Sequence, residues 1–127
     1  MIVVDASVVV NSLLGVLEPE TLSTIKQSQL GAPDILDVEV ASALRGLWLG
    51  HKLNDAALHE AVEDLGEFAA TRFTSTLLVP RAIRLRANLS VYDATYVALA
   101  EALECTLLTR DRRIAEAPGI QCAVEVI

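Results

Sequence analysis

Short apolar segments that alternate with longer amphipathic segments are the feature of this sequence that most constrains its fold. Ile2–Asp5 is β-branched and apolar up to its last residue, and Cys105–Thr109 reads "CTLLT". Continuous apolar runs of this length are typical of strands that are covered on both faces of a parallel sheet. Because helical patterns separate these runs, the sequence predicts an α/β fold, with a mostly parallel central β-sheet flanked by α-helices.

The same alternation continues along the whole chain. The predicted strands are Ile2–Asp5, Ala32–Asp34, Phe73–Thr76, Cys105–Thr109 and one within the C-terminal "QCAVEVI". The predicted helices are one capped by Ser7 and running to Leu14, then Glu20–Leu30, Leu36–Leu49, Asp55–Ala69 with Asn54 as its cap, Val79–Leu89, one that begins at the capping box "SVYD" of Ser90–Asp93, and a short one from Asp111. No repeat or Pro/Gly-rich linker interrupts them, so residues 1–127 are predicted to form a single domain.

The composition bears on whether the chain folds and on the cellular compartment in which it is found. Hydrophobic residues make up 53% of the 127 residues, which is enough for a packed core. Charges interrupt the apolar stretches before the roughly 20 residues that a membrane span needs, and Asp5 falls where a signal peptide would be apolar. We therefore expect a cytoplasmic protein that does not associate with membranes. Cys105 and Cys122 are too few for a disulfide framework and are predicted to be buried free thiols.

Two of the predicted strands end in a carboxylate that is accompanied by a hydroxyl residue. Asp5 ends the first strand and Ser7 follows it, while "LLTRD" places Thr109 and Asp111 at the end of another. The carboxyl ends of parallel strands share one edge of the sheet, which is where α/β proteins bind ligands. Each of these residues could also simply cap a helix, because Asp and Ser side chains accept hydrogen bonds from free N–H groups at helix starts.

Two further carboxylates lie near the starts of predicted helices. Glu39 lies at the edge of an apolar helical stripe, and Asp93 is the third residue after Ser90 in the capping box. If all four carboxylates met, their mutual repulsion would raise their proton affinity, and a divalent cation would relieve it. Without His or Cys ligands, the expected ion is Mg²⁺ or Mn²⁺. The residues alone leave two interpretations open: four separate helix caps, or one acidic metal site.

The order of these motifs resembles that of the PIN-domain ribonucleases, and most closely the VapC toxins of bacterial VapBC toxin–antitoxin modules. The similarity lies in "DAS" after the first strand, Glu39 on a helix, "YDATYVALA" and "LLTRD", and it spans the chain from Asp5 to about Asp111. It implies a PIN-like domain in which Mg²⁺ or Mn²⁺ activates water to cleave RNA internally, leaving 5′-phosphate and 3′-hydroxyl ends. The catalytic and metal-binding residues that it implies are Asp5, Glu39, Asp93 and Asp111, with supporting hydroxyls from Ser7 and Thr109.

The resemblance also implies partners. It points to a homodimer that is held inactive by a VapB-type antitoxin, whose C-terminal segment covers the site. An apolar groove could receive such a segment, although Trp48 is equally well explained as a core or dimer contact; the groove residues are Leu44, Leu47, Trp48 and Leu49. The net charge of −7 argues against general nucleic-acid binding. The candidate RNA contacts are therefore local, namely Arg110, Arg112 and Arg113 beside Asp111. Asn11, one and a half turns after Ser7, is a weaker candidate site residue that could face the same cleft or lie in solvent.

Other functions remain open at this point. A receiver-type or phosphatase-type domain also uses an acidic Mg²⁺ pocket, but Asp5 stands alone after its strand and position 7 is Ser. A metal-independent ribonuclease could use His51 and His59 as acid and base, although exposure to solvent explains both residues equally well. A third alternative is a PIN-fold protein that binds or processes RNA without acting as a toxin.

Overall fold

The computed structural model describes residues 1–127 and has one five-stranded sheet at its centre. The strands are β1 (Ile2–Val4), β2 (Leu30–Pro33), β3 (Ala70–Phe73), β4 (Thr106–Thr109) and β5 (Val124–Val126). They run in the order β3-β2-β1-β4-β5, and every neighbouring pair is parallel. The central strand β1 is in register with both neighbours, since Ile2 lies opposite Leu30 and Thr106. The predicted α/β class is confirmed.

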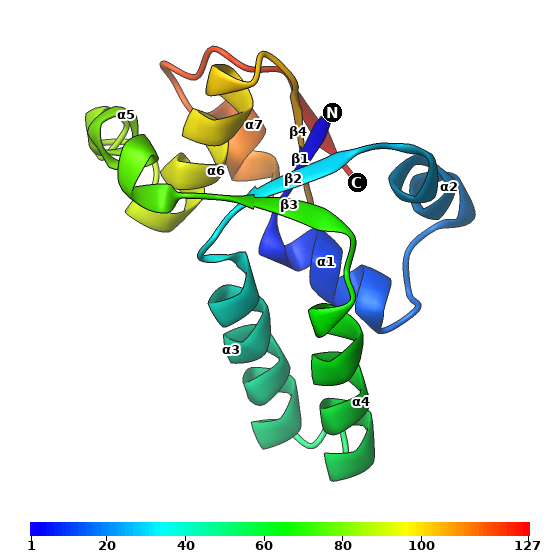
Figure 1. Cartoon of the computed structure of the whole chain (residues 1–127). Coiled ribbons are helices and arrows are strands. Elements are labelled where there is room, and N and C mark those ends of the chain that lie inside the picture. Colours follow the sequence, from blue (N-terminus) through cyan, green and yellow to red (C-terminus); the bar gives the residue numbers. More distant parts are fainter.

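Helices cover the sheet on both faces (Figure 1). They are α1 (Ala6–Leu13), α2 (Pro19–Gln27), α3 (Leu36–Leu49), α4 (Asp55–Gly66), the short 3₁₀ helix η1 (Ser75–Leu78), α5 (Val79–Arg84), α6 (Val91–Ala102) and α7 (Arg112–Glu116). Helix α6 packs against β1, β2 and β4, whereas α1 packs against α3 and β4. Helices α3 and α4 lie side by side and extend beyond the sheet (Figure 1). None of the helices has the length and apolar character that crossing a bilayer requires.

The hydrophobic core fixes the position of the first carboxylate. Val3 and Val4 of β1 and Val8 and Val9 of α1 are completely buried, so the chain on both sides of Asp5 is held inside the molecule. The backbone N–H of Asp5 donates to the carbonyl oxygen of Leu108 at 3.2 Å, which ties it to the end of β4. Burial of each of these valines is worth about 1.5 kcal/mol or more, which stabilises the backbone on both sides of Asp5 in this position.

Several predicted boundaries are wrong because long-range pairing overrides local patterns. Leu30, predicted to end a helix, begins β2, where it is buried opposite Ile2. The third strand is Ala70–Phe73 rather than Phe73–Thr76, because it continues the register of β2. The corrected helix limits are Leu13 for α1, Gly66 for α4 and Arg84 for α5.

Two expectations about side-chain burial also need correction. Helical spacing places Tyr92 in the apolar stripe of its helix, but the residue is 63% exposed. Cys105 and Cys122 are free thiols as predicted, yet both are only partly buried. They lie at the amino-terminal ends of β4 and β5, and therefore at the opposite edge of the sheet from Asp5.

A candidate acidic active site

The strand order places two of the predicted site segments side by side. From β1 the chain builds β2 and β3 on one side of the sheet, and it later adds β4 and β5 on the other side. The carboxyl ends of β1 and β4 therefore flank the topological switch point, where open α/β sheets leave a crevice for ligands. Asp5 directly follows β1, and Thr109 is the last residue of β4. Residues about a hundred positions apart in the chain thus meet at one edge.

Asp5 is held at this edge by three hydrogen bonds. The Ser7 hydroxyl donates to Oδ1 at 2.5 Å, the backbone N–H of Val8 donates to the same oxygen at 3.1 Å, and the Thr109 hydroxyl donates to Oδ2. Asp5 is consequently the side-chain cap of α1, and the prediction that Ser7 caps this helix is wrong. The side chain is nearly buried, and this burial raises its pKa above the usual range despite the hydrogen bonds. Ser7 and Thr109 therefore orient Asp5, as supporting hydroxyls would.

The four predicted carboxylates lie at the N-terminal ends of four different helices. Asp5 caps α1, Asp111 caps α7, and Glu39 and Asp93 lie in the first turns of α3 and α6. The positive end of each helix dipole favours a negative charge there, which offsets part of the repulsion within the group. The predicted cap at the start of α6 is also present, since the Ser90 hydroxyl oxygen accepts from the backbone N–H of Asp93 at 3.1 Å.

The pKa values show that these carboxylates influence one another. Burial is the main cause that raises the pKa of Glu39, and the charges of Asp93 and Asp5 raise it further. Burial also raises the pKa of Asp93, with added repulsion from Asp111 and Asp5. The structure therefore brings all four predicted carboxylates into one electrostatic group.

Asp111 differs from the other three because a cation accompanies it. Arg113 donates from its backbone N–H and from Nε to Oδ1, both at 3.0 Å, and from its guanidinium to Oδ2 at 2.7 Å. These hydrogen bonds hold the pKa of Asp111 below its usual range. Since Arg113 is largely exposed, this ion pair can open at little cost when a stronger cation competes for Asp111.

Arg110 is fixed beside the same group. Its guanidinium donates to the side-chain oxygen of Asn11 at 2.8 Å, in the amide orientation that satisfies both residues, and its backbone N–H donates to the Ser7 hydroxyl at 3.4 Å. Asn11 therefore lies next to the site. Arg112 is exposed on the first turn of α7. The cations near the site are thus at its rim, while the carboxylates lie deeper.

The residues at this edge fit a hard divalent cation. The buried Oε1 oxygen of Glu39 and the buried hydroxyl of Tyr96 lie next to each other, and neither has a hydrogen-bond partner apart from this mutual contact. Partly buried carboxylates that repel one another form a group that a cation would stabilise, and oxygen donors suit Mg²⁺ and Mn²⁺. No three of these side chains are arranged to ligate one ion directly. A bound ion would therefore keep several water ligands, as Mg²⁺ usually does.

An ion pair that no local sequence pattern indicates anchors the start of α3. Arg72 of β3 donates to the carboxylate of Asp37 at 2.8 and 3.1 Å, and to the carbonyl oxygens of Phe68 and Ala70 at 2.8 and 2.7 Å. Asp37 is two residues before Glu39, so this ion pair fixes the turn that carries Glu39. Arg72 and Asp37 are separated by 35 positions, which is why their pairing has no signal in the sequence.

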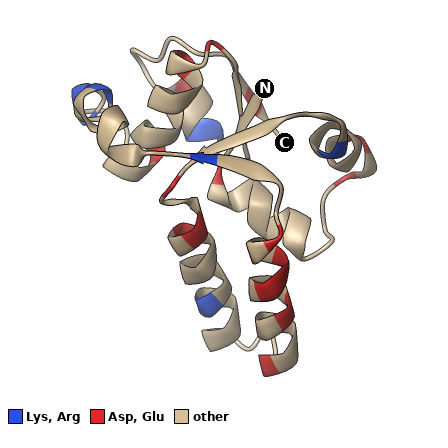
Figure 2. Ribbon diagram, in the orientation of Figure 1, with Lys and Arg blue, Asp and Glu red and all other residues tan.

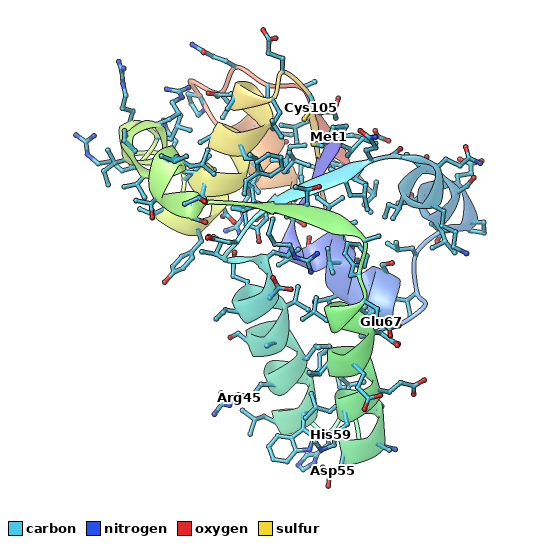
Figure 3. The ribbon with its side chains drawn as sticks, viewed as in Figure 1. Met1, Arg45, Asp55, His59, Glu67 and Cys105 are labelled. Carbon is cyan, nitrogen blue, oxygen red and sulfur yellow. The ribbon has the colours of Figure 1, made fainter.

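The far end of the α3–α4 pair does not contribute to the acidic site. His59 and Asp55 lie at that end, away from the sheet (Figure 3). Glu39 lies in the first turn of α3 and His51 follows the end of this helix, which separates them by about 18 Å along the helix axis. The predicted apolar groove is also wrong in part, because Leu44 is completely buried. A hollow of about 520 Å³ is lined instead by residues that include Trp48, Leu49 and Leu53.

A parallel sheet with carboxylates gathered at its switch point defines an α/β protein whose site suits a hard divalent cation. A family model described as "PIN domain" matches residues 2–120. The chain belongs to the PIN-domain family and, within it, to the VapC ribonucleases. This confirms the resemblance inferred from the sequence motifs.

Three relatives illustrate this similarity. The chain is 40% identical to "Ribonuclease VapC9" of Mycobacterium tuberculosis over 127 residues, covering 100% of this chain and 98% of that protein. It is 38% identical to "Ribonuclease VapC1" of the same species over 128 residues, covering 98% and 96%. The crystal structure of VapBC2 from Rickettsia felis, bound to a DNA fragment from their promoter, shares the fold with a TM-score of 0.69. That likeness covers 99% of this chain and 98% of that one at 14% identity.

Proposed function

We propose that this chain is a divalent-metal-dependent endoribonuclease that acts as the toxin of a toxin–antitoxin pair. The observation that carries the proposal is the group formed by Asp5, Glu39, Asp93 and Asp111, in which burial and mutual repulsion raise the pKa of three of the carboxylates. Its relatives are named ribonucleases, which supports RNA as the substrate. A PIN-fold protein that binds or processes RNA without a toxin role is the alternative.

The residues of the site are suited to different roles in RNA cleavage. Bound Mg²⁺ or Mn²⁺ would supply Lewis-acid stabilisation of the charge that develops on the phosphate and ease deprotonation of the attacking water. Asp5 is fixed in direction by Ser7, Val8 and Thr109, so it presents its carboxylate without needing to reorganise. Glu39 and Asp93 have raised pKa values and are suited to accept a proton from water. In-line attack by water on the phosphorus, with cleavage of the bond to the 3′ oxygen and protonation of that oxygen, would leave 5′-phosphate and 3′-hydroxyl ends.

The arginines at the rim of the site would bind the phosphates that flank the cleaved bond. Arg110 is already oriented by Asn11, which lowers the entropic cost of contact with RNA. Arg112 is exposed and can contact a phosphate directly. Arg113 forms an ion pair with Asp111, and it would become available to a phosphate only when Asp111 binds a metal ion. Acidic residues dominate the exposed side of α4 (Figure 2), so RNA is expected to approach from the sheet edge and not along α4.

Metal binding can be tested without any RNA. We expect Mn²⁺ to raise the melting temperature of the wild-type chain, since an ion that binds only the folded form contributes about 2.7 kcal/mol at a concentration of 100 Kd. The measurement is a thermal-shift titration, with Asp5→Asn as the variant that loses the shift and Asp55→Asn, at the far end of α4, as the matched control that keeps it. No shift at millimolar Mn²⁺, together with RNA cleavage that survives EDTA, would contradict metal dependence.

The partner prediction is tested by mass. We expect the chain to form a homodimer by itself and a larger complex when it is co-expressed with a VapB-type antitoxin, in which RNA cleavage is suppressed. The Klebsiella pneumoniae and Rickettsia felis structures with the same fold are described as toxin–antitoxin or VapBC complexes, which supports this expectation. Light scattering coupled to size exclusion gives the masses. A monomer whose mass and activity ignore the antitoxin would refute the toxin role.

A further inference from the structure

A hollow of about 450 Å³ lies directly beside the acidic site. Val38, Glu39, Ser42 and Ala43 of α3 form one side of it, and Tyr92 of α6 forms the other. Glu39 lines this hollow and also belongs to the acidic group, and Tyr92 immediately precedes Asp93. The hollow therefore continues the candidate site outward along the gap between two helix starts.

Two apolar side chains of this hollow are unusually exposed. Tyr92 is 63% exposed and Val38 is 73% exposed. Tyr96, one turn further along the same helix, is only 2% exposed. Tyr96 is therefore part of the packing of α6 against the sheet, whereas Tyr92 is exposed to solvent. Large apolar groups that remain open next to a polar site are typical of ligand-binding surfaces.

We infer that this hollow binds an unpaired RNA base, with the Tyr92 ring as its stacking platform. The inference rests on the proposed function, and it narrows the substrate to RNA that is single-stranded at the cleavage point. The hollow offers an aromatic ring and an apolar side chain but no Lys or Arg, so it suits a neutral, flat base better than a phosphate. The base can stack on Tyr92 and lie against Val38, as bases splayed from single strands do on aromatic side chains.

The polar groups of the hollow suit particular edges of a base. The Glu39 carboxylate is an acceptor, and the Ser42 hydroxyl can donate or accept. A carboxylate next to a stacked base accepts from exocyclic amino groups, which cytosine, adenine and guanine carry and uracil lacks. The hollow is therefore expected to favour bases with an amino group.

The test measures RNA binding in an Asp5→Asn background, in which cleavage is removed. Short fluorescent single-stranded RNAs are titrated with this variant and followed by anisotropy. Adding Tyr92→Ala is expected to weaken binding about 5- to 150-fold, because one base stack is lost. Tyr92→Phe keeps the ring and should keep the affinity. Val62→Ala, on the exposed side of α4, is the matched control and should not change it.

A second arm asks whether Tyr92 contacts a base. Abasic sites are introduced one at a time into the RNA, and at one position the loss of affinity caused by Tyr92→Ala should disappear. Double-stranded RNA should show no effect of the substitution, because its bases are already stacked. If Tyr92→Ala lowered the affinity equally for every abasic RNA, Tyr92 would contact no base and the inference would be overturned. A change in the oligomeric mass of the protein on Tyr92→Ala would also overturn it, and would identify Tyr92 as a subunit contact. Failure of the wild-type chain to cleave any RNA would instead contradict the proposed function.

Discussion

Asp5→Asn is expected to abolish RNA cleavage while it raises the thermal stability of the metal-free protein. The substitution removes the charge that the site presents, and loss of one such electrostatic contribution reduces kcat by roughly 10³-fold. Asn retains a side-chain oxygen that can accept from Ser7 and Val8, its amide N–H can donate to the Thr109 oxygen where Oδ2 accepted before, and it caps helices as well as Asp does. Because the ionised Asp5 is destabilised by burial, its neutral replacement should raise the melting temperature, by about 4 °C for each kcal/mol gained.

The pH dependence of this gain follows from the sign of the pKa change. Asp5 has a higher pKa folded than unfolded, so the folded state is penalised once the group ionises. The stability of the wild-type chain relative to Asp5→Asn should fall as pH rises from the ordinary carboxyl range, about 4, through the raised pKa, and then level off. Calorimetry in EDTA across this range measures the difference.

Comparison with Asp5→Ala separates the effect of the Asp5 charge on stability from the effect of its hydrogen bonds. Asp5→Ala leaves the hydroxyls of Ser7 and Thr109 and the N–H of Val8 without their acceptor, so it should lose stability at every pH. If Asp5→Asn lost stability in the same way, or if its cleavage rate equalled that of the wild-type chain, the role assigned to Asp5 would be wrong.

Arg72→Met is expected to lower the free energy of unfolding by about 2–4 kcal/mol and to reduce cleavage as well. Four hydrogen bonds to Asp37, Phe68 and Ala70 are lost, and each contributes about 0.5–1.5 kcal/mol, with the two to the exposed Asp37 carboxylate at the low end. The first turn of α3 then loses its link to β3, and Glu39 moves with that turn. Urea unfolding and single-turnover cleavage measure the two effects.

The control for Arg72 is Asp37→Asn, which keeps the hydrogen bonds to the two carbonyl oxygens and should cost about 1 kcal/mol. The hydrogen bonds from Arg72 hold the pKa of Asp37 below its usual range. The stability that this provides is present above the ordinary pKa of Asp and is lost as pH falls through the lowered value. Equal stability of Arg72→Met and the wild-type chain at neutral pH would show that this ion pair does not anchor α3.

Local sequence patterns predicted those features that depend on neighbouring residues. The alternation of apolar strands and amphipathic helices is confirmed, and so are the helix caps Asn54, Ser90 and Asp111. These succeed because helix caps and hydrophobic periodicity depend on groups within a few residues of each other. The motif order also identified the family, since it preserves the residue types that one site needs.

The tertiary structure alone decided which of these residues meet and how. The hydrogen bond from Thr109 to Asp5 spans 104 positions and exists because β4 pairs with β1, and Arg72 reaches Asp37 because β3 continues the sheet beyond β2. Tyr92 and Tyr96 are four residues apart, which predicts that they share one face of a helix, yet Tyr92 is exposed and Tyr96 is buried. The sequence determined the class of fold and the kinds of side chain at the site. Strand pairing and helix rotation, which depend on packing between distant segments, determined its geometry.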